Sequence, residues 1–152
     1  MKKRTAYNIL SVLLVSLFLT GCLNDLFEQE DQTYQGEAKL EFRPQTDTFD
    51  EDEGEVEVLI QLIGAQRDND VSVNFLVDEE TTAEAGTHYE LLSTSPVTIP
   101  ANSSSAAVTI NLDGNSLPEG EIRTLFLRLE NRGDVEPAQN LDTYELTIEG
   151  VE

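Results

Sequence analysis

The chain has 152 residues, of which 30 are acidic and nine are basic, so its formal net charge is −21 at pH 7. Such an acidic surface repels phosphate groups, which argues against nucleic acid as a partner. The sequence has a single cysteine, so no disulfide can form within the chain. A hydrophobic core therefore has to hold the fold by itself.

The N-terminus has the three-part layout of a secretory signal peptide. Basic residues occupy positions 2–4, an apolar run extends from Ile9 to Leu19, and small residues then precede Cys22. The apolar run is shorter than the roughly 20 residues that a membrane-spanning helix needs. We therefore expect residues 1–21 to be a cleaved signal peptide.

The sequence Leu19-Thr20-Gly21-Cys22 resembles the lipobox of bacterial lipoproteins. The resemblance implies cleavage before Cys22 and acylation of its sulfur and its amine. Several acyl chains hold a protein durably on a bilayer, because each buried CH₂ contributes about 0.8 kcal/mol. The alternative is an ordinary signal peptide that leaves a free thiol, but a lone cysteine in an exported chain favours the lipobox. We expect the membrane to be a partner through lipidated Cys22, in the bacterial cell envelope.

Residues 22–35 are rich in acids and amides and lack periodicity, which predicts an acidic tether between lipid and domain. The acids of this segment resemble the surface-export signals of some Gram-negative lipoproteins, but a solvated linker explains them equally well. Leu23 follows the cysteine, where the Asp that marks inner-membrane retention stands in well-known lipoproteins. We therefore expect the outer membrane, with the domain exposed to the periplasm or at the cell surface.

From residue 36 onward, apolar and polar residues alternate with a period of two, which is the signature of β-strands. An acidic loop at 44–54 and turns near 64–70, 100–102 and 113–121 separate these runs. Seven short strands without helical periodicity predict an all-β fold, a seven-stranded immunoglobulin-like antiparallel β-sandwich in one domain over residues 36–150. The apolar positions of the expected strands are Ala38, Leu40 and Phe42; Val56, Val58, Ile60 and Leu62; Val71, Val73, Phe75 and Val77; Val97 and Ile99; Val108, Ile110 and Leu112; Leu125, Leu127 and Leu129; and Tyr144, Leu146 and Ile148.

The order of three motifs resembles the Calx-β domain. That family has an Ala-x-x-Gly-x-Asp-Tyr core, then an apolar-x-apolar-Pro-Gly turn, and then an acidic stretch before a Phe-x-Leu-x-Leu strand. The resemblance covers most of residues 36–150 and implies a seven-stranded immunoglobulin-like sandwich, although Ala101 replaces the glycine of the second motif. Calx-β-like domains also occur in small lipoproteins, in agreement with the lipobox. The matching residues are Ala83 or Ala85, Gly86 and Tyr89; Val97, Ile99 and Pro100; and Glu119, Glu121, Phe126, Leu127 and Leu129.

Calcium is the one cofactor that the resemblance implies, because some Calx-β domains bind it at loops gathered at one end of the sandwich. Calcium takes six to eight oxygen ligands, which several converging carboxylates can supply. Two departures argue against binding: Gly114 and Asn115 follow Asp113 where binding members carry consecutive aspartates, and His88 replaces their Asp before Tyr. An EF-hand loop is excluded, because its twelfth position, counted from Asp50, is Gln61. The metal ligands carried over by position are Asp78, Glu79, Glu80, Asp113, Glu119 and Glu121.

The stretch Ala-Gly-Thr-His-Tyr-Glu at 85–90 contains the only histidine of the sequence. A Ser-His-Asp hydrolase would have to use His88, but the serines at 103–105 lie on a predicted turn without a nucleophile elbow. We therefore expect no enzyme, with a small envelope hydrolase as the weakest alternative. The stretch is better interpreted as a structural turn, in which Gly86 supplies backbone freedom and Tyr89 fills the sandwich interior.

Taken together, these features predict a lipid-anchored envelope module with a noncatalytic binding, adhesion or structural role. Sandwich domains present loops and sheet edges to partners, so an envelope protein or a glycan is expected as the partner. The absence of tryptophan leaves few aromatic side chains on which a sugar could stack. The Arg132-Gly133-Asp134 tripeptide resembles an integrin-binding sequence, but a turn between the last two strands explains it better.

Overall fold

The computed structural model describes residues 36–114 and 116–152, and this part of the chain contains strands and no helix. Accordingly, it holds no helical segment of the length and apolarity needed to cross a bilayer. The predicted signal peptide, Cys22 and the tether at 22–35 lie outside the described residues. The strands are β1 (Lys39–Phe42), β2 (Thr46–Asp50), β3 (Glu55–Ile63), β4 (Val71–Val73), β5 (Phe75–Val77), β6 (Tyr89–Leu91), β7 (Val97–Ile99), β8 (Ser105–Leu112), β9 (Ile122–Leu129), β10 (Glu136–Pro137) and β11 (Thr143–Glu149).

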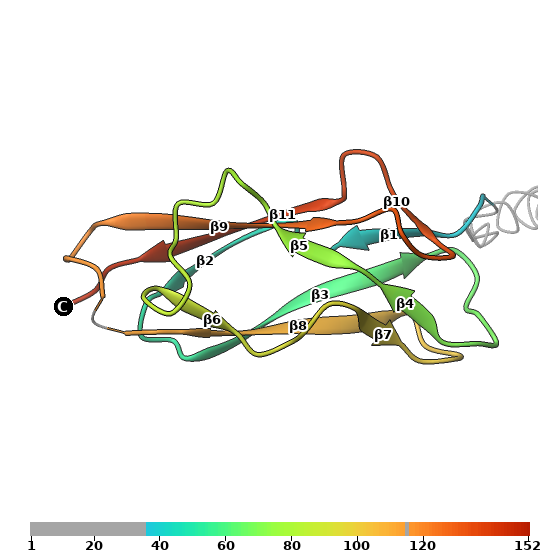
Figure 1. Cartoon of the computed structure of the whole chain (residues 1–152), viewed down its shortest axis with the longest axis horizontal. Coiled ribbons are helices and arrows are strands. Elements are labelled where there is room, and N and C mark those ends of the chain that lie inside the picture. Colours follow the sequence, from blue (N-terminus) through green and yellow to red (C-terminus); the bar gives the residue numbers. More distant parts are fainter. Residues whose placement is uncertain (1–35, 115) are drawn as a thin grey trace, which may run out of the picture. The chain divides into compact units, whose positions relative to one another are not determined.

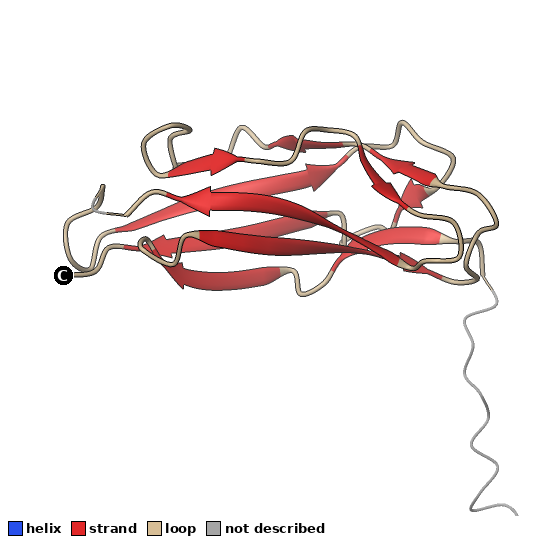
Figure 2. Ribbon diagram, turned by 90° about the horizontal axis from the view of Figure 1, so that it is seen from below, coloured by secondary structure: helices blue, strands red, loops and turns tan. Residues whose placement is uncertain are grey.

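The strands form a β-sandwich, which confirms the predicted fold class (Figure 1). One sheet has five strands in the order β10-β1-β3-β8-β6, and the facing sheet has four in the order β2-β11-β9-β5. A third, two-stranded sheet pairs β4 with β7. Most pairs are antiparallel, but β1 lies parallel to β10 and β2 lies parallel to β11. The strands run along the long axis of the sandwich, so its loops gather at two ends (Figure 2).

All seven expected strands occur, and the described residues contain additional strand segments. The expected strand at 71–77 is divided at Asn74 into β4 and β5, which belong to different sheets. Strands β6 and β10, of three and two residues, were not expected. The prediction of an acidic loop at 44–54 is wrong in part, because residues 46–50 form β2. After β1, the chain crosses from the five-stranded to the four-stranded sheet, where β2 pairs with β11.

The core lies between the two main sheets and is built from their inward-facing rows. Central strand β11 contributes Tyr144, Leu146 and Ile148, all 0% exposed. The Tyr144 ring lies 5.7 Å from the Phe42 ring, centroid to centroid, so the first strand, β1, and the last strand, β11, contact each other in the core. Each fully buried large apolar side chain contributes roughly 1.5–3 kcal/mol. The loops at both ends of the sandwich therefore connect strands that are fixed by this core.

The two ends of the sandwich carry different parts of the chain (Figure 1). The first described residues lie at one end, which we call the N-terminal pole, together with the β3–β4 and β7–β8 loops. The chain ends at the opposite end, the C-terminal pole, together with the β2–β3 turn (residues 51–54) and the β8–β9 loop (described at 113–114 and 116–121). The β5–β6 loop reaches this pole as well, because the Asp113 N–H donates to the His88 carbonyl at 3.2 Å.

Candidate functional site

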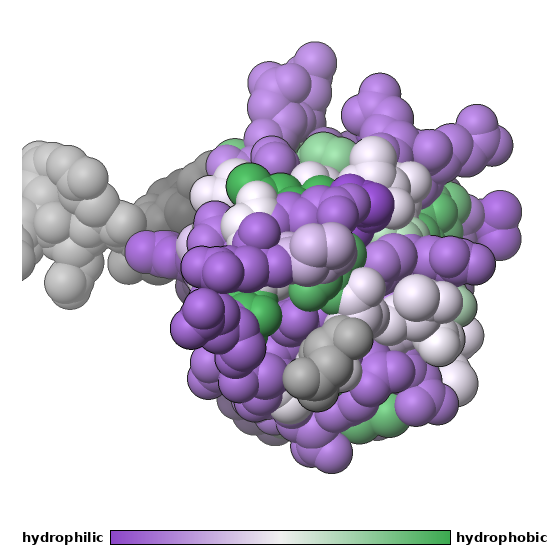
Figure 3. Space-filling view, turned by 90° about the vertical axis from the view of Figure 1, so that its left-hand side faces the viewer, coloured by the Kyte–Doolittle hydropathy of each residue, from purple (hydrophilic) through white to green (hydrophobic). Residues whose placement is uncertain are grey.

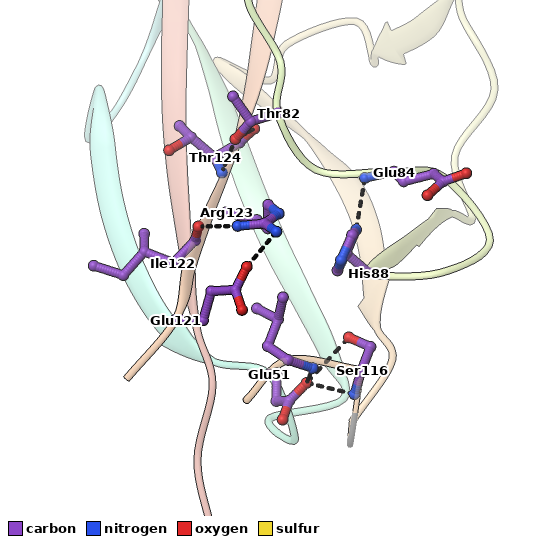
Figure 4. Close-up of polar contacts among 10 residues, drawn as sticks. Glu51, Thr82, Glu84, His88, Ser116, Glu121, Ile122, Arg123 and Thr124 are labelled. Carbon is purple, nitrogen blue, oxygen red and sulfur yellow. Dashed lines mark hydrogen bonds and ion pairs between the residues drawn. The ribbon is translucent and has the colours of Figure 1, made fainter. Parts of the chain in front are cut away.

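The C-terminal pole brings together loops from distant parts of the sequence. Its surface is mainly hydrophilic, with isolated apolar patches (Figure 3). In Figure 4 the side chains of Glu51, His88 and Glu121 come from three different segments, and each points toward its own partner: Ser116, the Glu84 N–H and Arg123, respectively. The resemblance to Calx-β domains placed a possible metal site at such loops, so the contacts of each acid decide what the region can bind.

Glu51 is the most deeply buried acid of the described residues, with 1% of its surface exposed. Its Oε2 accepts hydrogen bonds from the Ser116 N–H at 2.8 Å, the Ser116 hydroxyl at 3.1 Å and the Leu117 N–H at 2.9 Å. The carboxylate thus joins the β2–β3 turn to the β8–β9 loop, 65 residues later in the sequence. Sequence reasoning did not single out this residue, because it lies in an acidic run that is typical of solvated loops.

Close backbone contacts hold the same loop on its other sides. The Gly120 N–H donates to the Gly150 carbonyl at 2.9 Å, and the Gly150 N–H donates to the Glu121 carbonyl at 2.8 Å. A Cβ atom at Gly150 would come within 2.2 Å of the Pro118 carbonyl oxygen, and one at Gly114 within 3.2 Å of Asp52. The β8–β9 loop is therefore packed tightly between the β2–β3 turn and the end of the chain.

His88 is 8% exposed, and its imidazole takes part in local backbone structure. Its Nδ1 accepts a hydrogen bond from the Glu84 N–H at 2.8 Å (Figure 4). Two residues earlier, Gly86 has φ of +77°, a value that favours glycine, and its N–H donates to the Tyr89 carbonyl at 2.8 Å. Tyr89 is 4% exposed, and burial raises the pKa of its phenol. These contacts make the stretch a compact turn.

The serines considered as nucleophiles lie far from this histidine. In the turn before β8, the Asn102 N–H donates to the Arg67 carbonyl at 2.8 Å, which ties the turn to the β3–β4 loop at the N-terminal pole. His88 lies at the C-terminal pole, where its carbonyl accepts the Asp113 N–H of the β8–β9 loop at 3.2 Å. The fold therefore forms no Ser-His pair from the residues that the hydrolase alternative requires.

Two of the six predicted calcium ligands form ion pairs with arginines. Asp78 Oδ2 lies 2.6 Å from Arg128 Nε, and its Oδ1 accepts the Glu80 N–H at 3.0 Å. That N–H and the Arg128 guanidinium hold the pKa of the Asp78 carboxyl below its usual value. Glu121 is paired with Arg123.

The other four predicted ligands, Glu79, Glu80, Asp113 and Glu119, are exposed. Across residues 36–114 and 116–152, no three His, Cys, Asp or Glu side chains are grouped closely enough to hold a metal ion. The structure therefore does not bring the six predicted ligands together as one metal site.

The N-terminal pole has a polar cavity of about 320 Å³. Within it, Lys39 Nζ lies 3.0 Å from Glu136 Oε2, and this ammonium lowers the pKa of the Glu136 carboxyl. The neighbouring Arg-Gly-Asp tripeptide is packed against the domain, since Arg132 pairs with Glu130 and a Cβ at Gly133 would lie 2.8 Å from the Ser72 carbonyl oxygen. The cavity is lined by Glu37, Ala38, Lys39, Arg67, Asp134 and Glu136.

No family model matches the sequence, and no curated protein matches it. Solved structures share the fold. The apo-form Calx CBD1 domain aligns with a TM-score of 0.63 at 22% identity, over 77% of this chain and 100% of that domain. The Calx CBD2 domain aligns with a TM-score of 0.63 at 13% identity, over 79% of this chain and 92% of that chain. The calcium binding domain CBD12 of CALX1.1 aligns with a TM-score of 0.57 at 22% identity, over 74% of this chain and 44% of that chain. The fold is thus that of the Calx-β domains, an immunoglobulin-like β-sandwich.

Proposed function

We propose that the protein is a lipid-anchored, noncatalytic β-sandwich module of the bacterial cell envelope that presents its C-terminal pole to a partner. The observation that supports this proposal is the placement of the two ends of the domain. The described chain begins at one pole and carries its packed acidic loops at the other (Figure 1). In this proposal the acidic tether joins lipidated Cys22 to the N-terminal pole, and the opposite pole is the surface offered to the partner.

The anchor is tested by substitution of the proposed lipidated cysteine. We expect the native protein to incorporate labelled palmitate and to fractionate with membranes, and globomycin to block its maturation. Cys22→Ala should abolish the labelling and release the protein, whereas Asn24→Ala, two residues after the cysteine, should change neither. A Cys22→Ala protein that still fractionates with membranes would contradict the anchor.

The presentation of the C-terminal pole is tested by cross-linking in cells. A photoreactive residue in place of Glu53, which is exposed in the β2–β3 turn, should give adducts with an envelope protein or a glycan. The same residue in place of Gln66, exposed at the N-terminal pole, serves as the matched control. If only position 66 gave adducts, the partner would bind the N-terminal pole, and the proposal that the C-terminal pole is the partner surface would be wrong.

Calcium binding is the competing function, and the fold shared with a domain named for calcium binding supports it. A ligand present at 100 times its Kd stabilises the folded state by about 2.7 kcal/mol, so binding would raise the melting temperature. Melting curves in calcium and in EDTA, with magnesium at equal ionic strength as the control, distinguish the two functions. Identical curves at millimolar calcium would exclude the calcium module.

A further inference from the structure

The acids of the C-terminal pole do not fit a calcium site in their present contacts. Glu121 is paired with Arg123, Asp78 is paired with Arg128 at the junction of β5 and β9, and the described residues contain no cluster of three metal-ligating side chains. Calcium needs several carboxylate or carbonyl oxygens converging at about 2.3–2.6 Å. Protein contacts do join these loops, and Glu51 makes three of them.

Among residues 36–114 and 116–152, Glu51 is a carboxylate that connects two loops of this pole, and one of its oxygens is already occupied by protein donors. Glu51 Oε2 accepts two backbone N–H groups and a hydroxyl, all within 3.1 Å. A cation bound to the same oxygen would displace these donors, and a buried N–H left without a partner costs about 1–3 kcal/mol. The tight approach of Gly150 to Pro118 leaves the loop little room to move aside.

We infer that Glu51 is an internal latch, which fixes the β8–β9 loop on the β2–β3 turn and takes the place of a bound cation at this pole. A carboxylate that receives several N–H donors neutralises the partial positive charges of a loop, as an anion does at a helix terminus. The pole therefore keeps its folded form without calcium. The inference does not depend on the membrane anchor, because it concerns contacts within the domain alone.

Thermal melting of the purified protein tests the latch. We expect the native protein to melt at the same temperature in 5 mM calcium and in EDTA at matched ionic strength. Glu51→Gln should lower the melting temperature by roughly 5–10 °C, because an amide supports these charge-assisted hydrogen bonds poorly, and calcium should not restore it. Glu53→Gln, an exposed acid of the same turn, should change the melting temperature by less than about 2 °C.

Hydrogen exchange gives a second measurement that does not need a folded variant. The Ser116 and Leu117 amides of the native protein should be protected in EDTA as strongly as in calcium, since Glu51 holds both. Protection that appears only with calcium would overturn the inference. So would a calcium-dependent rise in melting temperature that Glu51→Gln abolishes, because Glu51 would then be a metal ligand.

Discussion

At the scale of single residues, the central polar contact of the core is that of Tyr144. The residue is 0% exposed, and its hydroxyl donates a hydrogen bond to Asp47 Oδ2 at 2.9 Å. Burial, together with the Asp47 carboxylate, raises the pKa of this phenol far above its ordinary value. Asp47 belongs to β2, so this side-chain bond adds to the backbone pairing of the edge strand β2 with the central strand β11.

This contact predicts a loss of stability in alkali. The folded state holds Tyr144 neutral, whereas the unfolded chain ionises near pH 10. The raised pKa of Tyr144 therefore adds to the free energy of unfolding. This stabilisation is fully present below about pH 10 and is lost as the pH rises above that value. Tyr144→Phe should cost about 1 kcal/mol at neutral pH for the lost hydrogen bond and should flatten the alkaline decline in denaturant melts. Equal alkaline declines in both proteins would contradict this assignment.

The burial of Glu51 could not be predicted from the sequence. Its acidic run predicts a solvated loop, because nothing near it in the sequence indicates a buried partner. The N–H groups that donate to its carboxylate belong to Ser116 and Leu117, which are distant in the sequence and approach Glu51 only in the folded chain. In contrast, the positive φ of Gly86 and the burial of Tyr89 agree with the turn expected from that local stretch.

At the scale of elements, period-two alternation predicts the long strands well because each has one buried face. The alternation cannot show which sheet a strand joins, and residues 71–77 therefore look like one strand although the chain changes sheets at Asn74. Strand β2 escaped prediction because one of its inward positions is Asp47, a polar residue that serves the Tyr144 hydroxyl. Strands β6 and β10 are too short to show a period.

The central position of β11 predicts a large effect for a core truncation on this strand. Leu146 is 0% exposed and lies between β2 and β9. Leu146→Ala should destabilise the domain by about 2–5 kcal/mol in urea unfolding, through lost burial and the cavity left behind. Leu76→Ala on β5, where the leucine is 38% exposed, is the matched control and should cost less than about 1 kcal/mol. Similar losses for both variants would show that β11 is not central to the core.

The junction of β5 and β9 gives a prediction at acid pH. The pKa of Asp78 is lowered by the Glu80 N–H and by Arg128, so the folded state favours the carboxylate. The lowered pKa of Asp78 therefore adds to the free energy of unfolding. This stabilisation is present above the ordinary carboxyl pKa of about 3.9 and is lost as the pH falls below that value. Asp78→Asn should therefore reduce the pH dependence of stability between about pH 4 and pH 2. Asp113→Asn, an exposed aspartate, should leave the acid limb unchanged.

At the scale of the whole molecule, the charge is strongly one-sided. Residues 22–152 carry all 30 acids but only six of the nine basic residues, a net charge of −24. Four of these basic residues are already in ion pairs, namely Lys39, Arg123, Arg128 and Arg132. The remaining acids repel one another, and this repulsion lowers the stability of the compact folded state.

This repulsion predicts that salt of any kind stabilises the domain. Raising NaCl from 10 mM to 300 mM shortens the Debye length from about 30 Å to about 6 Å and screens the acids from each other. We expect the melting temperature to rise by a few degrees, and by less in a Glu53→Lys/Glu119→Lys variant, whose net charge is less negative. Calcium and magnesium at equal ionic strength should then act alike, because both screen the same charges. If calcium alone raised the melting temperature, and NaCl and magnesium did not, the cause would be a specific metal site. The prediction that general screening of the acidic side chains stabilises the domain would then be wrong.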